Sequence, residues 1–168
     1  MIQQATLEFL ISAMRLLTMP EITFFYVTNQ PTAFANLDRD LDLLSDSLYA
    51  AKTQAGIAEA GPDITRYYKA DNGTHLGKPD LYLMEVGIPV KPGTPPAGEA
   101  HIKTLPPYHC AGLLLWGSLV PHITQAYDTL KQNIQSAGLK PTGECREWNY
   151  RFESVDSPNN LLGLYMGI

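Results

Sequence analysis

A late segment of the chain, residues 144–152, combines charged, amide and aromatic side chains in the order Glu-Cys-Arg-Glu-Trp-Asn-Tyr-Arg-Phe. In an extended strand Glu147 and Asn149 point to one side, while Trp148 and Tyr150 point to the other. The aromatic side is the natural core side, which leaves Glu147 and Asn149 on the open face of the strand. A carboxylate there contacts either water or a ligand, and water is the commoner outcome for an acidic strand residue.

A glutamate enclosed by aromatic side chains would select cations. Loss of hydration makes a lone buried carboxylate costly, so such a site favours protonation or a cationic partner, and aromatic faces add roughly 0.5 to 2 kcal/mol of cation–π attraction. Aromatic residues on neighbouring segments are candidate walls: Phe34, Tyr67, Tyr68, Tyr82, Trp116 and Tyr165. Tyr82 and Trp116 are the preferred ones. Strand aromatics are more often core residues, so we expect about half of the set to contact a ligand.

Other catalytic or metal signatures are missing from the sequence. His75, His101, His109 and His122 lack the spacing of a metal-binding motif, so we predict no metal site. The sequence contains no P-loop, no G-x-G-x-x-G and no G-x-S-x-G, which removes support for nucleotide binding and for serine hydrolase chemistry. We expect no cofactor.

Length, composition and net charge limit the classes of protein to which this chain can belong. The 168 residues, of which 45% are hydrophobic, suffice for one domain with its own core. The net charge of -5 argues against direct nucleic-acid binding, which depends on Lys and Arg. Cys110 and Cys145 form no CxxC motif, which indicates structural thiols in a cytoplasmic protein.

The N-terminal segment, residues 1–19, is predicted to form a short amphipathic helix. Leu7, Leu10, Ile11, Met14 and Leu17 follow helical spacing. The apolar stretch is too short for a membrane span and lacks the features of a signal peptide. Its apolar stripe would pack on its own domain or against a second subunit, and a homodimer stays open.

Residues 20–168 show two similar series of elements, 20–91 and 99–168, joined by a Pro- and Gly-rich connector at 91–98. The first series has predicted strands at 23–27, 32–35, 64–69 and 81–90 and a helix over 37–55 that ends at Gly56. The second has predicted strands at 102–105, 108–116, 148–152 and 161–166 and a helix over 120–134, stopped at Gly138.

An offset of 82 residues aligns the two series, from Gly56 to Gly138, and it also pairs Tyr68 with Tyr150. The shared order strand, helix, strand, strand predicts a duplicated β-α-β-β unit of the SHS2-like kind. The fold class is therefore α+β, with antiparallel strands, two long helices on one face and a cleft between the halves on the other.

The chain resembles the GyrI-like effector-binding family over roughly residues 21–168. The resemblance rests on the run Glu-Val-Gly-Ile-Pro-Val at 85–90, the run Leu-Pro-Pro-Tyr-His-Cys-Ala-Gly at 105–112, Trp-Gly at 116–117, Ala-Gly at 137–138 and Arg-Glu at 146–147. It implies a central cleft for bulky, aromatic or cationic molecules, with Glu147 as the key polar group. Asn149 stands where the family commonly has Tyr. Haem-binding relatives would make His109 or His122 a candidate ligand, but nothing around either residue supports that role.

The resemblance implies two classes of function. The first is a stand-alone binding domain that senses or sequesters hydrophobic cations, related to the ligand domains of AraC- and MerR-type regulators. The second is a hydrolase of reactive cyclopropane-type electrophiles, with Glu147 as general acid or base. The sequence shows no helix-turn-helix segment, so regulation would require a partner chain, and a gyrase-type protein partner rests on family analogy alone.

Overall fold

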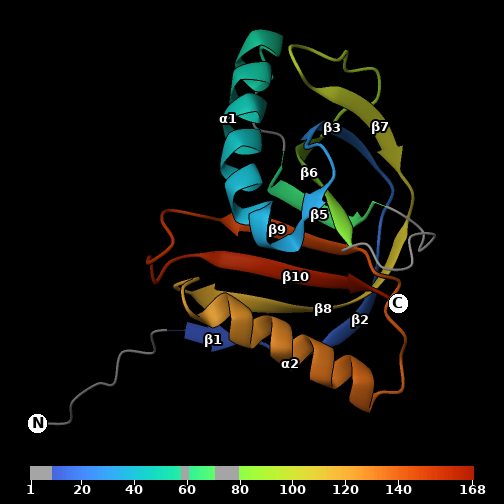
Figure 1. Cartoon of the computed structure of the whole chain (residues 1–168), viewed down its shortest axis with the longest axis vertical. Helices are drawn as coiled ribbons and strands as arrows, with labels where there is room; N and C mark the ends of the chain where they lie inside the picture. Colours follow the sequence, from blue (N-terminus) through green and yellow to red (C-terminus); the bar gives the residue numbers. More distant parts are fainter. Residues whose placement is uncertain (1–8, 58–60, 71–79) are drawn as a thin grey trace, which may run out of the picture.

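A computed structural model describes residues 9–57, 61–70 and 80–168 of the chain (Figure 1). The described strands are β1 (Phe9–Ile11), β2 (Arg15–Met19), β3 (Ile22–Thr28), β4 (Thr32–Ala33), β5 (Asp63–Lys69), β6 (Leu81–Val90), β7 (His101–Leu105), β8 (Tyr108–Gly117), β9 (Cys145–Arg151) and β10 (Leu161–Gly167). The helices are α1 (Leu37–Ala55) and α2 (His122–Ser136), with a 3-10 turn at Phe34–Asn36 before α1.

The strands form one antiparallel sheet in the order β1-β8-β10-β9-β5-β6-β3-β7, with β2 also paired to β8 and β4 to β6. Strands β5 and β9 meet at the centre, where Thr65 lies opposite Glu147. Their bounds, 63–69 and 145–151, differ by the offset of 82 residues that the sequence suggested. The α+β class and the antiparallel sheet with two helices are thus confirmed, whereas an internal duplication stays a prediction.

Each helix covers one half of the same face of the sheet. Leu44, Leu48 and Ala51 of α1 pack on strands β3 and β6, and Ala126, Leu130 and Ile134 of α2 pack on strands β8 and β10. These residues recur at helical spacing, so each helix buries a single apolar stripe. The helix α1 ends at Gly56, whose φ of 62° is the left-handed conformation that glycine adopts without strain.

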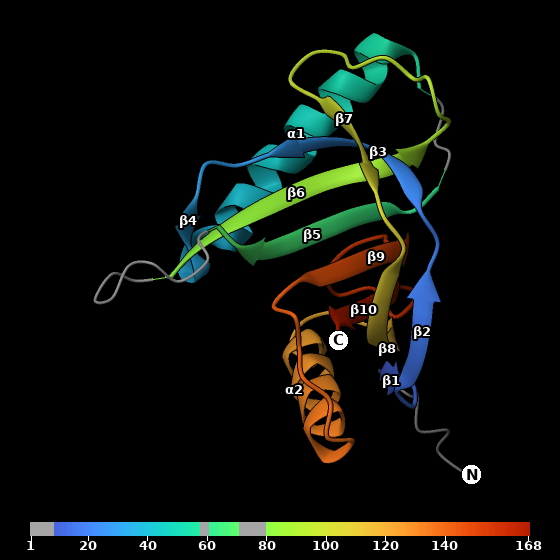
Figure 2. The same ribbon diagram turned by 90° about the vertical axis from the view of Figure 1, so that its right-hand side faces the viewer.

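Strands from the two predicted halves pair with each other at the junction. The strand β7 pairs with β3 of the first half, although residues 99–168 were assigned to the second. The strand β2 pairs with β8 of the second half although it precedes β3 directly. Figure 2 shows β2 running into β3, and β7 into β8, along one side of the molecule. The predicted boundary at 91–99 therefore does not separate two sheets.

The prediction of an N-terminal helix is wrong for residues 9–19. These residues form the strands β1 and β2, both paired to β8, while residues 1–8 lie outside the described part. The ten-residue strand β8 would otherwise expose a long row of unpaired backbone groups. Pairing that edge outweighs the burial of the predicted apolar stripe, since Leu10 remains 59% exposed in β1.

Within the described residues, neither helix is long and apolar enough to span a membrane. The same residues contain no group of three or more His, Cys, Asp or Glu side chains that could hold a metal ion.

Candidate functional site

Glu147 lies on the face of the sheet that the helices cover. The hydroxyl of Tyr127, on α2, donates a hydrogen bond of 2.5 Å to Glu147 Oε1. Trp148, the next residue of β9, packs on the opposite face against Tyr165 and Phe24. The sequence correctly separated the two sets of side chains, but its assignment of the aromatic set to the helix-covered core was wrong.

The carboxyl group of Glu147 lies in a poorly hydrated environment. Its pKa is raised above the usual range of a glutamic acid, first by burial, while the hydrogen bond from Tyr127 acts in the opposite direction and the charge of Asp38 on α1 raises it further. Among the described residues, no Lys or Arg forms an ion pair with Glu147. The group therefore lacks the cation that a buried carboxylate ordinarily requires.

Three of the predicted aromatic residues form one group on the helix-covered side of the sheet. The ring of Phe34 packs edge-on against Tyr82 and Tyr67, with centroids 5.3 and 6.4 Å away. Tyr67 lies opposite Cys145, two residues along β5 from Thr65, which lies opposite Glu147. Burial, Cys145 and Glu147 together raise the pKa of Tyr67. Phe34 is 60% exposed, so one side of this aromatic group remains open to solvent.

Asn149 shares the helix-covered face with Glu147, two residues along β9. It lies opposite Leu162, a residue of the core beneath α2, and is half-buried. Of the predicted site, Glu147, Asn149, Phe34, Tyr67 and Tyr82 thus lie on the helix-covered side of the sheet.

The other three predicted residues lie on the opposite face. Tyr68 donates a hydrogen bond to Glu85, Tyr165 packs against Trp148, and Trp116 is 48% exposed near the end of β8. Trp116, a preferred wall residue from sequence, is therefore separated from Glu147 by the sheet itself.

The centre of that opposite face is filled by ion pairs, in the place where the sequence predicted a groove. Arg66 bonds Glu85 and Glu144 at 2.8 and 2.6 Å, Lys103 bonds Glu85 at 2.5 Å and Arg146 bonds Glu144 at 2.7 Å. Although burial alone would raise the pKa of Glu144, the hydrogen bonds from the two arginines lower it below its usual value. These carboxylates are neutralised by the protein.

Tyr127 is the residue of the site that the sequence analysis did not select. It appears in the sequence as one member of the apolar stripe of the second helix. A tyrosine in such a stripe needs a hydrogen-bond partner when it is buried, and this requirement was the available signal.

The histidines of the described part have partners other than Glu147. His109 bonds Thr18 at 2.8 Å, and the ring of His122 stacks on Phe9 at 3.6 Å. Cys110 and Cys145 are free and buried. His75 lies outside the described residues.

No protein-family model matches the chain, and no curated protein matches it by sequence. Solved structures do match. The chain superposes on the "EcmrR C-terminal domain" with a TM-score of 0.64 at 14% identity, covering 92% of this chain and 96% of that one. The structure of "SAV2435 bound to tetraphenylphosphonium" matches with a TM-score of 0.67 at 8% identity, covering 93% of each chain.

The chain has the GyrI-like fold. The expected resemblance is thus confirmed at the level of the fold. The same fold occurs in a "hydrolase from Listeria innocua", with a TM-score of 0.53 at 10% identity, covering 92% of this chain and 90% of that one. In the "EcmrR-DNA complex" the GyrI-like fold is one part of a longer protein, because this chain spans 59% of that EcmrR chain.

Proposed function

We propose that this protein binds bulky hydrophobic cations between its two helices, with Glu147 as the counter-ion. The observation that carries the proposal is the half-buried carboxylate of Glu147, which accepts a hydrogen bond from Tyr127 and has no ion pair with a described residue. A ligand cation would supply the charge that the protein does not, and would stabilise the ionised carboxylate.

The aromatic residues beside Glu147 suit the apolar body of such a ligand. Phe34, Tyr67 and Tyr82 offer faces and edges at which a cation is attracted by the ring quadrupole. The structural neighbour SAV2435 is bound to tetraphenylphosphonium, and this cation is a suitable probe for the proposed site. Sensing on behalf of a regulator is the corresponding cellular role, by analogy with EcmrR.

Titration with tetraphenylphosphonium tests the proposal, using intrinsic fluorescence or calorimetry. Wild type should bind the cation more tightly than the neutral triphenylphosphine oxide, and Glu147→Gln should weaken cation binding by about tenfold or more because a charge-assisted contact is lost. Glu21→Gln, which removes an exposed carboxylate, is the matched control. Equal affinity of wild type and Glu147→Gln for the cation would refute the proposal.

A second function is favoured by the 2.5 Å hydrogen bond and the raised pKa of Glu147, both of which suit a general acid or base. In a hydrolysis of a strained ring, Glu147 would take a proton from water as the water oxygen bonds to carbon. The ring bond breaks, and the proton passes to the leaving atom. Consumption of an epoxide or activated cyclopropane at equal rates by wild type and Glu147→Gln would exclude this reaction.

A further inference from the structure

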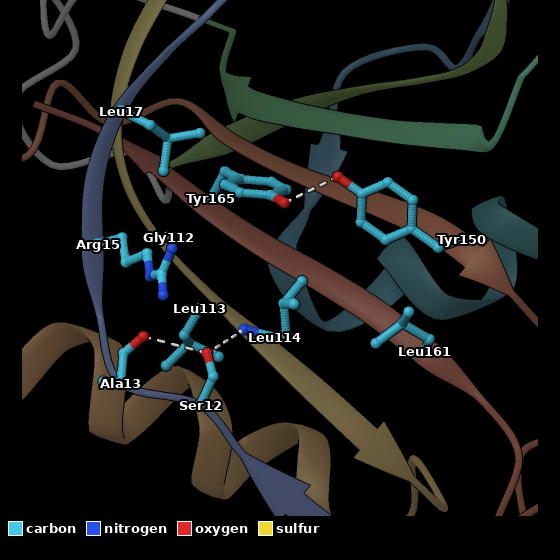
Figure 3. A pocket seen from close by; sticks show the side chains of 10 residues that line it. All are labelled: Ser12, Ala13, Arg15, Leu17, Gly112, Leu113, Leu114, Tyr150, Leu161 and Tyr165. Carbon is cyan, nitrogen blue, oxygen red and sulfur yellow. Dashed lines mark hydrogen bonds between the residues drawn. The ribbon is translucent and has the colours of Figure 1, made fainter.

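A hollow lies on the face of the sheet that the helices do not cover. It has a volume of about 530 Å³, within the range of small-molecule sites. Its lining comes from β2, β8, β9, β10 and the turn between β1 and β2 (Figure 3). Glu147 and Tyr127 are not among its lining residues, so this hollow is separate from the site proposed above.

Glycine and a break in the strand edge create the hollow. A Cβ atom on Gly112 would lie 2.3 Å from the ring of Tyr165, and one on Gly163 would lie 2.6 Å from it. The ring of Tyr165 can therefore lie flat over β8 and β10 only because both positions are glycine. Between β1 and β2, the Ser12 hydroxyl accepts the hydrogen bond of the Leu114 amide, so this edge stays paired where the chain leaves the ladder.

The polar groups of the hollow are matched to an anion. Arg15 lies opposite Gly112, and Gly112 lies opposite Tyr165, so the three residues form one row across β2, β8 and β10. Figure 3 shows the Arg15 side chain reaching over β8 at Gly112, with Tyr165 and Tyr150 beyond it. No carboxylate of the described residues forms an ion pair with Arg15, unlike Arg66 and Arg146 on the same face.

The two tyrosines add hydroxyl donors next to this cation. Tyr150 Oη and Tyr165 Oη lie 2.8 Å apart and share one hydrogen bond, which leaves the second proton of the pair free to point at a ligand. Leu17, Leu114 and Leu161 line the rest of the hollow. Beyond Leu161 the apolar surface continues to Trp116, directly opposite it on β8.

We propose that this hollow binds a small amphipathic carboxylate. The guanidinium of Arg15 and the tyrosine hydroxyls hold the carboxylate, and the apolar chain lies against Leu114 and Leu161 toward Trp116. Charge-assisted hydrogen bonds from Arg to a carboxylate are the strong contacts of such a site. The apolar walls supply the affinity that an exposed ion pair alone does not.

Calorimetric titration with decanoate, decanol and decylammonium tests the proposal. Wild type should bind decanoate more tightly than either analogue. Arg15→Gln should weaken decanoate binding by about tenfold or more, and Arg15→Lys should restore part of it because the positive charge returns. Arg39→Gln, which removes an exposed arginine on α1, is the matched control, and a melting curve establishes that each variant is folded.

Three results would overturn the proposal. The first is equal affinity of wild type and Arg15→Gln for decanoate, and the second is equal affinity of wild type for decanoate and decanol. The third is a decanoate affinity that falls as the protein concentration rises, which would mean that a second copy covers this face. Glu147→Gln should bind decanoate as wild type does, and Arg15→Gln should bind tetraphenylphosphonium as wild type does. The two proposed sites can therefore be tested independently of each other.

Discussion

Glu85 and Glu147 are two carboxylates near the centre of one sheet, but they lie on opposite faces and have opposite surroundings. Glu85 is 3% exposed and receives bonds from Arg66, Lys103 and Tyr68. Glu147 receives one from Tyr127. Two cations offset the cost of burying Glu85, whereas a neutral hydroxyl offsets only part of that cost for Glu147.

The difference separates a structural carboxylate from a candidate binding group. Where the protein itself neutralises a carboxylate, a ligand cation adds little further stabilisation. A buried carboxylate that lacks a cation is destabilising in the free protein and becomes favourable when a cation arrives. Glu85 should therefore contribute more to the stability of the free protein than Glu147 does.

The largest expected effect is on stability when Glu85 is neutralised. Glu85→Gln leaves Lys103 without its charge partner and removes one of the two carboxylates that Arg66 contacts, and we expect a loss of about 3 kcal/mol in the free energy of unfolding. Glu147→Gln should change it by less than about 1 kcal/mol, because the amide oxygen can still accept the bond from Tyr127. Urea unfolding measures both, and similar losses for the two variants would contradict the comparison.

A smaller effect is expected from removing the tyrosine hydroxyls. Tyr127→Phe leaves Glu147 buried without its donor and should cost about 1 to 3 kcal/mol, whereas Tyr68→Phe should cost about 1 kcal/mol or less because Glu85 keeps two cations. The same unfolding experiment provides the test. A larger loss for Tyr68→Phe than for Tyr127→Phe would show that the cations do not satisfy Glu85.

The smallest expected effect is an opposite pH dependence on the two faces. The raised pKa of Glu147 means that the folded protein holds this proton more tightly, so wild type should lose stability relative to Glu147→Gln as the pH rises above 4.5. The lowered pKa of Glu144 gives the opposite pH dependence of stability. The advantage of wild type over Glu144→Gln should be present at neutral pH and should disappear as the pH falls below 4.5.

Urea unfolding of the three proteins at several pH values between about 3 and 7 would measure these slopes. Parallel pH profiles for Glu144→Gln and Glu147→Gln would mean that the two carboxylates share one kind of environment, against the geometry described above.

Local patterns predicted several residues of the candidate site, whose role stays a prediction. Glu147 was selected as a carboxylate in an aromatic strand, and Phe34, Tyr67 and Tyr82 form a group on the same side of the sheet. Tyr68, Trp116 and Tyr165 were chosen by the same reasoning and lie on the other face. Residue type and strand membership did not distinguish the two groups, because neighbouring residues of a strand belong to opposite faces.

Local sequence patterns were sufficient to predict the class of fold, the end of α1 at Gly56 and the two sets of side chains on β9, because helical spacing, glycine and strand alternation act over a few residues. Which set on β9 faces the helices depends instead on how the helices pack on the assembled sheet. It also turned residues 9–19 into strands, since the edge of β8 that they pair with exists only once the sheet has formed. The pairing of residues 9–19 with β8 joins segments about a hundred residues apart, which no local pattern contains.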